Sequence, residues 1–132
     1  MTALTSGQAA QEAGVNIETL RFYERKGLID EPPRLESGHR RYPSDVIARI
    51  RFIKNAQELG FSLNEIDELL SLRIESGSTA ADVRQRVVTK IADIDQKMRR
   101  LRAMKKSLRH LAEACSGCGP VSECPILDNL DS

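Results

Sequence analysis

All three cysteines of the chain lie close together near its C-terminus. Cys115, Cys118 and Cys124 belong to a segment rich in serine, glycine and proline, a composition that predicts a loop rather than a regular helix. Thiolates at short spacing in a loop suit soft metal ions, and because the thiolate is the ligand, metal binding releases protons. These three residues are therefore the candidate ligands of a thiophilic metal ion.

Other uses of the thiols match the sequence less well. An odd number of cysteines does not make a disulfide framework, and an iron–sulfur cluster needs four thiolates where this chain has three. A zinc site would need a fourth ligand, for which His110 is the nearby candidate. No histidine adjoins a cysteine and the loop has no nucleophile motif, which indicates that the protein is not an enzyme.

The composition indicates in which cellular compartment the thiols would be found. The chain has 132 residues and a net charge of +1, so its length fits one domain and it is not polybasic as a whole. No apolar run approaches the roughly 18 residues that span a bilayer, and the N-terminus lacks the basic and apolar parts of a signal peptide. We expect a cytoplasmic protein with reduced thiols and no membrane partner.

In the first half, short helices would position the functional residues. Residues 8–13 predict a brief helix, and residues 17–26 a second one with Asn16 as its N-cap and Gly27 behind it. Two helices at this spacing predict a helix-turn-helix. Residues 28–42 contain helix-breaking prolines and a glycine, then a run that can be extended, and predict a small two-stranded wing.

Two further helices precede a linker. Residues 44–60 carry apolar side chains at helical spacing. Ser62 and Glu65 match a capping box at the start of the next helix, in which each side chain bonds an amide that the helix leaves unpaired. Residues 75–79 predict a linker, and Thr79 is a suitable N-cap for the segment that follows it.

The segment 80–114 contains neither proline nor glycine and predicts one long helix. At about 1.5 Å per residue it would be roughly 50 Å long. An apolar stripe recurs along it at spacings of three and four, interrupted by Lys105, and a stripe of this length must be buried against a partner. We expect an antiparallel coiled coil between two copies of the chain. The stripe consists of Val87, Ile91, Ile94, Met98, Leu101 and Leu108.

Positive charge is concentrated between residues 21 and 54, where nine basic residues outnumber five acidic ones. Such a patch attracts phosphates and releases counterions from DNA. Arg21 and Tyr23 on the second helix are candidates for the major groove, and Arg40, Arg41 and Tyr42 for the flanking backbone. The alternative is that some of these charges face solvent or pair with the neighbouring acids. The nine are Arg21, Arg25, Lys26, Arg34, Arg40, Arg41, Arg49, Arg51 and Lys54.

Four motifs, each weak alone, follow one another along the chain. They are Thr19-Leu-Arg-Phe-Tyr-Glu-Arg-Lys-Gly-Leu-Ile29, Arg40-Arg41-Tyr42, Arg51-Phe-Ile-Lys54 and Leu59-Gly-Phe-Ser-Leu-Asn-Glu-Ile66. In this order and spacing the chain resembles the MerR family of transcriptional regulators over nearly its whole length. The resemblance implies a mainly α fold, with a winged helix-turn-helix, a long dimerisation helix in an antiparallel coiled coil, and a C-terminal effector loop. It places the DNA contacts at Thr19, Arg21, Tyr23, Arg40, Arg41 and Tyr42.

The end of the chain resembles the metal-responsive branch of that family. The 18 residues after Ala114 are too few for a drug-binding domain, and Cys115 and Cys124 match the two cysteines that frame the family's metal loop. Sensors of divalent ions carry a further cysteine where this chain has Ala80, whereas sensors of Cu(I), Ag(I) and Au(I) lack it. Cys118 is an added thiol that would make a three-thiolate site for Hg(II) or Pb(II). The sequence favours the coinage metals over that alternative.

These patterns divide the chain into a DNA-binding domain at 1–75, a dimerisation helix at 76–114, and a metal-binding loop and tail at 115–132. The resemblance implies a homodimer on double-stranded promoter DNA that changes the bend and twist of the DNA for RNA polymerase when metal binds. Two alternatives stay open. One is a redox-sensing regulator of the same family with an iron–sulfur or thiol switch, and the other is a DNA-binding protein without an effector.

Overall fold

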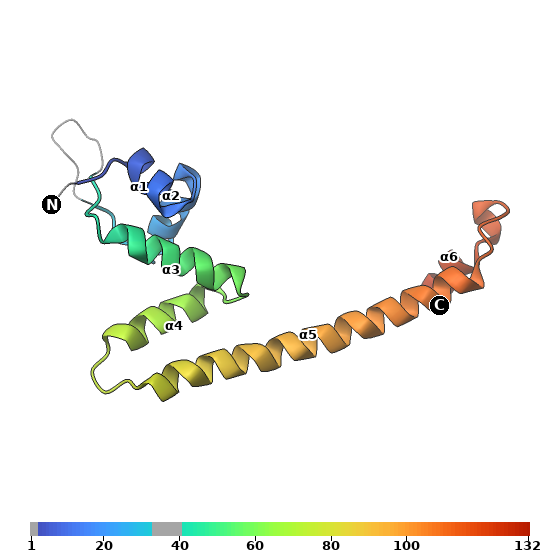
Figure 1. The fold of residues 1–132 in the computed structure, drawn as a ribbon. Coiled ribbons are helices and arrows are strands. Elements are labelled where there is room, and N and C mark those ends of the chain that lie inside the picture. Colours follow the sequence, from blue (N-terminus) through green and yellow to red (C-terminus); the bar gives the residue numbers. More distant parts are fainter. Residues whose placement is uncertain (1–2, 33–40) are drawn as a thin grey trace. The chain divides into compact units, whose positions relative to one another are not determined.

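The structure is a computed structural model that describes residues 3–32 and 41–132, drawn as a coloured ribbon in Figure 1. Contacts divide the chain into two units, Met1–Arg86 and Val87–Ser132. Within the described ranges the regular elements are helices, and β pairing is confined to one isolated bridge. The division at 1–75, 76–114 and 115–132 stays a prediction.

Four helices form the framework of the first unit, and they confirm the four helices predicted from the sequence. Their ends differ from the predicted ends by one or two residues, which is the usual uncertainty at a fraying terminus. The helices are α1 (Ser6–Ala13), α2 (Ile17–Arg25), α3 (Val46–Glu58) and α4 (Leu63–Ile74).

Side chains cap the starts of three of these helices. The Asn16 side chain accepts the Thr19 N–H at 2.7 Å at the start of α2, as predicted. The predicted capping box of α4 is present, with the Ser62 N–H donating to Glu65 at 2.7 Å. A second capping box, formed by Thr5 before α1, lies outside the predicted helix because the prediction begins two residues inside the observed one.

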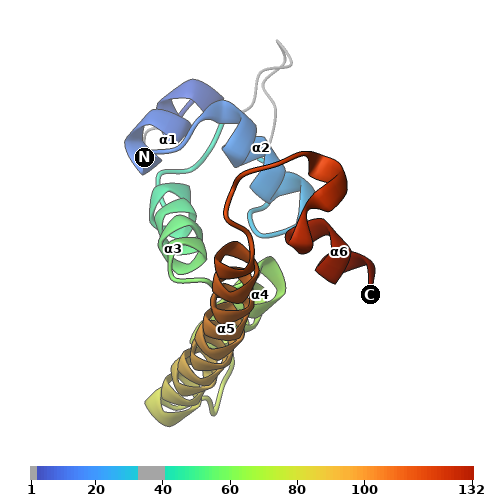
Figure 2. The ribbon, with the colours of Figure 1, turned by 90° about the vertical axis from the view of Figure 1, so that its right-hand side faces the viewer.

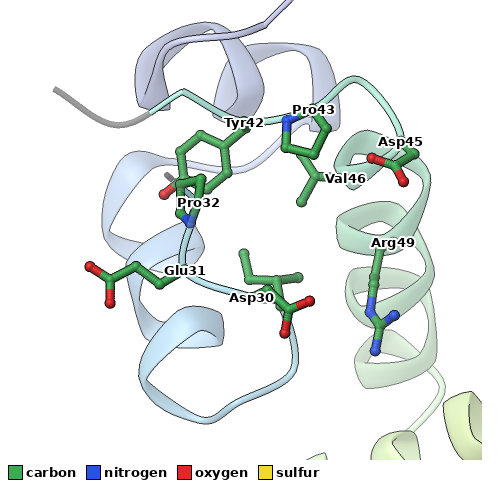
Figure 3. Close-up of a pocket in the computed structure, with 9 residues that line it drawn as sticks. Asp30, Glu31, Pro32, Tyr42, Pro43, Asp45, Val46 and Arg49 are labelled. Carbon is green, nitrogen blue, oxygen red and sulfur yellow. The ribbon is translucent and has the colours of Figure 1, made fainter. Parts of the chain in front are cut away.

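The core of the first unit lies between α3 and the other helices. α3 buries Ile50 and Ile53 completely, at the helical spacing seen in the sequence, and α4 adds Ile66. Figure 2 shows α1, α2 and α3 grouped together around this core. Tyr23 and Tyr42 are also core residues, with 2% and 0% of their surface exposed.

The predicted two-stranded wing falls mostly on residues 33–40, which lie outside the described residues. The end of the wing segment is described: Leu4 and Tyr42 form an antiparallel bridge with N···O distances of 2.8 Å and 2.7 Å. The bridge joins the base of the wing segment to the stretch of chain just before α1.

The helix α5 runs from Ala80 to Ala114 and confirms the predicted long helix. At its start, the Thr79 N–H donates to Asp82 at 2.8 Å, and Arg86 in the second turn of α5 forms an ion pair with Glu68 of α4. The predicted apolar stripe is exposed in the single chain, from 40% at Ile94 to 63% at Leu108. Side chains this apolar and this exposed along one helix require a partner.

The tail after α5 contains a loop, a short 3₁₀ turn at Val121–Glu123 and a last helix, α6 (Pro125–Asp131). The sequence predicts the loop but not α6. Pro125 occupies the first turn of α6, where its fixed φ suits a helix start and its missing N–H is not needed. In the described part of the chain, no helix is both long enough and apolar enough to cross a membrane.

Candidate DNA interface and metal site

The structure brings Cys115 and Cys124 together across the loop. The pKa of the Cys124 thiol is lowered, chiefly by the backbone N–H groups of Leu127 and Ile126 in α6, and also by a hydrogen bond from Cys115. Cys115 is half-buried, and its sulfur accepts the Gly117 N–H at 3.4 Å. A thiol pair of this kind, one member of which ionises readily, is a suitable donor set for a soft metal ion.

Cys118 stands apart from this pair. Its side chain is exposed, and its backbone N–H donates to the Ser116 hydroxyl at 3.3 Å. Among residues 3–32 and 41–132, no three His, Cys, Asp or Glu side chains are grouped so that they could hold a metal ion. In the described single chain, Cys115 and Cys124 are therefore the thiols in contact, and Cys118 and His110 lie outside that pair.

The helix α2 presents part of the expected DNA surface. Arg21, Arg25 and Lys26 are exposed, and Thr19 is half-buried near the start of the helix. The Lys26 ammonium lies 5.6 Å from the centre of the Phe22 ring. Arginine and lysine side chains exposed on a recognition helix can reach base edges or phosphates.

At the wing, the structure covers only part of the expected contacts. Arg40 lies outside the described residues. Arg41 is described and half-buried, directly before the bridge that Tyr42 makes with Leu4. The position of Arg41 beside a fixed backbone is compatible with a phosphate contact.

The two tyrosines expected at the DNA surface have partners within the protein. The Tyr23 hydroxyl donates to Gln57 of α3 at 2.6 Å, and the Tyr42 hydroxyl donates to the carboxylate of Glu24 on α2. Burial raises the pKa of Tyr23, with a further contribution from the charge of Glu58. Both rings are buried and both hydroxyls join α2 to its neighbours, and a DNA contact of either tyrosine stays a prediction.

Within the basic segment, three of the nine cations bond to backbone carbonyls. Arg49 Nε donates to the carbonyl of Leu28 at 2.9 Å. Arg51 and Lys54 donate to carbonyls at the end of α1 and in the turn after it. Counting charges along the sequence identified the basic segment, but it could not show which cations bond to another part of the chain.

Comparison with known proteins assigns the chain to a family. The family model described as "MerR HTH family regulatory protein" matches residues 4–72, and the one described as "MerR, DNA binding" matches residues 47–111. The chain belongs to the MerR family. The mainly helical fold class predicted from the sequence is thereby confirmed, and the chain is a DNA-binding transcriptional regulator rather than an enzyme.

Several MerR-family relatives are similar over nearly the full length of the chain. The mercuric resistance operon regulatory protein of Bacillus cereus is 43% identical over 124 residues, 94% of either chain. The structure of the regulator PbrR691 from Ralstonia metallidurans in complex with lead(II) has a TM-score of 0.86 at 33% identity, covering 96% of this chain and 98% of that one. The regulator MerR from Bacillus megaterium in complex with mercury(II) has a TM-score of 0.73 at 37% identity, with the same coverage.

Proposed function

We propose that this MerR-family protein is a homodimeric transcriptional activator that responds to a thiophilic metal ion through Cys115 and Cys124. The thiol pair is the observation that carries the proposal, because it joins the end of α5 to the start of α6. Relatives that are named for mercury resistance, or whose structures contain lead or mercury, support the same sensing class.

The DNA side of the proposal rests on α2 and the wing. Thr19 and Arg21 would face the major groove, and Arg40 and Arg41 would bind the flanking phosphates. The exposed stripe of α5 would be buried against a second copy, so that two such surfaces meet one stretch of double-stranded promoter DNA. We place this dimer in the cytoplasm, where RNA polymerase is its partner at the promoter.

Metal binding would act as a two-state switch. With an ion held between them, Cys115 and Cys124 would fix the loop between α5 and α6 in one arrangement. The ion must bind the activating state of the dimer more tightly than the other state. In that state the promoter would change its bend and twist, which confers specificity at bases that the protein does not touch.

Two classes of metal are candidates for the site. The pair of Cys115 and Cys124, with no third thiolate beside it in the described residues, favours the coinage metals Cu(I), Ag(I) and Au(I). These ions suit a linear site made of two thiolates. Hg(II) or Pb(II) is the second candidate, supported by the relatives and by Cys118, which would have to move to join the pair.

Replacing a ligand tests the sensing function. Cys115→Ser or Cys124→Ser should abolish metal-induced transcription from a reporter while leaving affinity for the same promoter DNA unchanged. Ser116→Ala, in the same loop, is the matched control and should respond normally. Normal induction by every metal in either cysteine variant would remove the thiol pair as the sensor.

Cys118→Ser separates the two classes of metal. With a two-thiolate site the variant should keep its response to Cu(I) or Ag(I), whereas with a three-thiolate site it should lose its response to Hg(II) or Pb(II). Titrating the reduced variant and the unchanged protein with each ion gives the same comparison without transcription. Loss of Ag(I) binding in the variant would count against the two-thiolate assignment.

A further inference from the structure

The end of α1 is completed by residues that come from a different helix. The last carbonyls of any helix lack partners within it. The N–H groups of Gly14 and Val15 bond back to the carbonyls of Gln11 and Ala10. These two bonds do not serve the carbonyls nearer the turn, which include those of Glu12 and Gly14. No basic residue lies in the last turn of α1 to serve them.

Two cations of α3 bond to these remaining carbonyls. Arg51 Nη2 donates to the carbonyl of Glu12 at 2.6 Å, and Lys54 Nζ donates to the carbonyl of Gly14 at 3.1 Å. Arg51 and Glu12 are 39 positions apart in the chain, and Lys54 and Gly14 are 40 positions apart, so these bonds join distant segments. Charged donors make stronger hydrogen bonds than neutral ones, and a cation is favoured at the negative end of a helix dipole.

Packing holds the part of α3 that carries both cations, while the Arg51 side chain is exposed and the Lys54 side chain is half-buried. Arg51 and Lys54 are three residues apart and therefore lie on one face of α3, while the adjacent Ile50 and Ile53 are fully buried. Gly14 has a φ of 76°, in the left-handed region, and a Cβ there would lie 3.4 Å from Lys54 Nζ. The turn thus passes close to the ammonium group where glycine leaves room for it.

The clamped turn leads directly into the DNA-reading helix. Gly14 and Val15 form the turn, Asn16 caps α2, and α2 starts at Ile17. A change in the turn would therefore move the start of α2, where Thr19 and Arg21 lie.

We propose that Arg51 and Lys54 are positioning residues that clamp the turn of the helix-turn-helix and do not contact phosphate. Both carry charge in the basic segment, yet their charged groups are used within the protein. This assignment rests on the proposed function only in that the protein must bind DNA. It adds a role for two residues of the motif Arg51-Phe-Ile-Lys54.

The salt dependence of DNA affinity distinguishes clamping from phosphate binding. Removing a phosphate contact flattens the slope of log affinity against log salt by about 0.9, whereas moving a helix weakens binding and leaves the slope unchanged. Arg51→Met and Lys54→Met remove the donor and keep most of the stem. Each should lower affinity on the order of tenfold at an unchanged slope.

Conservative variants and a matched control complete the experiment. Arg51→Lys and Lys54→Arg keep a charged donor and should recover most of the affinity, and they remain informative if a methionine variant fails to fold. Arg84→Met removes one exposed cation of α5 and should change neither affinity nor slope. The probe is a duplex that the unchanged protein selects from a random library.

Two results would overturn the clamp. One is a slope flattened by about one unit in Arg51→Met or Lys54→Met, which would make the residue a phosphate contact. The other is unchanged affinity in a folded variant that lacks both donors. Failure of the unchanged protein to select any duplex would instead refute the proposed function, so the two failures are distinguishable.

Discussion

The first unit and the helix α5 treat the same kind of apolar pattern in opposite ways. Every buried hydrophobic side chain of the described part lies between Leu4 and Leu70. The one buried residue of α5 is Lys90, within 4.0 Å of Asp93. α3 and α5 both show apolar residues at helical spacing, but the chain itself covers the stripe of α3. Periodicity identifies a face that must be covered and does not say whether the cover is the same chain.

The largest expected effect comes from breaking the exposed stripe of α5. Ile94→Asp would place a carboxylate in an apolar seam between two copies, which costs several kcal/mol of dimerisation free energy, about 2–7 for an uncompensated polar group. Analytical ultracentrifugation should then show a monomer or an unfolded chain. Gln96→Asp adds the same charge on an exposed position outside the stripe and should stay dimeric. A stable Ile94→Asp dimer would show that this stripe is not the seam.

A cavity in the first unit should affect folding and spare association. Ile53→Ala removes a side chain that is fully buried within one chain, and should lower the free energy of unfolding by about 2–5 kcal/mol. Urea unfolding followed by circular dichroism measures the loss. Sedimentation under native conditions should still give a dimer. Dissociation of the dimer by this substitution would mean that the two regions are not as separate as their burial indicates.

The buried tyrosines sharpen the comparison, since they hold the first unit together through polar bonds. Tyr42→Phe keeps the ring and removes the donor to Glu24, and should lower the free energy of unfolding by about 1–2 kcal/mol. Tyr23→Phe should lower it less, because its partner Gln57 is exposed and can bond to water instead. Thermal unfolding of the two variants side by side measures the difference. Equal losses would remove partner exposure as the explanation.

The smallest effect is expected at a helix cap. Ser62→Ala removes the hydroxyl that accepts the Glu65 N–H and should destabilise α4 by about 1 kcal/mol. Ser71→Ala in the same helix removes a hydroxyl that bonds only to the carbonyl four residues earlier, and should be close to neutral. Urea unfolding of both variants measures the two losses of unfolding free energy. A larger loss in Ser71→Ala than in Ser62→Ala would contradict the prediction.

Local signals explain what the sequence could predict. The absence of proline and glycine between residues 80 and 114 determined the extent of α5, and Ser62 with Glu65 determined the start of α4, because both depend on neighbouring residues. The choice of Cys115 and Cys124 as a pair came from the resemblance, and the structure places the two thiols in contact, while their role as ligands stays a prediction.

Long-range contacts explain what the sequence could not predict. Tyr23 and Arg51 carry groups that could bind DNA, but their partners lie 34 and 39 residues away in the chain. Only the packed helices show that the Tyr23 ring is buried and that the exposed Arg51 side chain bonds to the end of α1. α6 was missed because seven residues are too few for a clear helical period, even though Pro125 is a suitable first residue.

The bridge between Leu4 and Tyr42 has a practical consequence for how the protein is prepared. Trimming the chain through Leu4 would remove the residue to which the backbone N–H and carbonyl of Tyr42 bond, although every arginine of the basic segment would still be present. A cleavable tag at the N-terminus therefore has to leave Leu4 intact, and a preparation nicked there would bind DNA weakly while its mass is nearly unchanged.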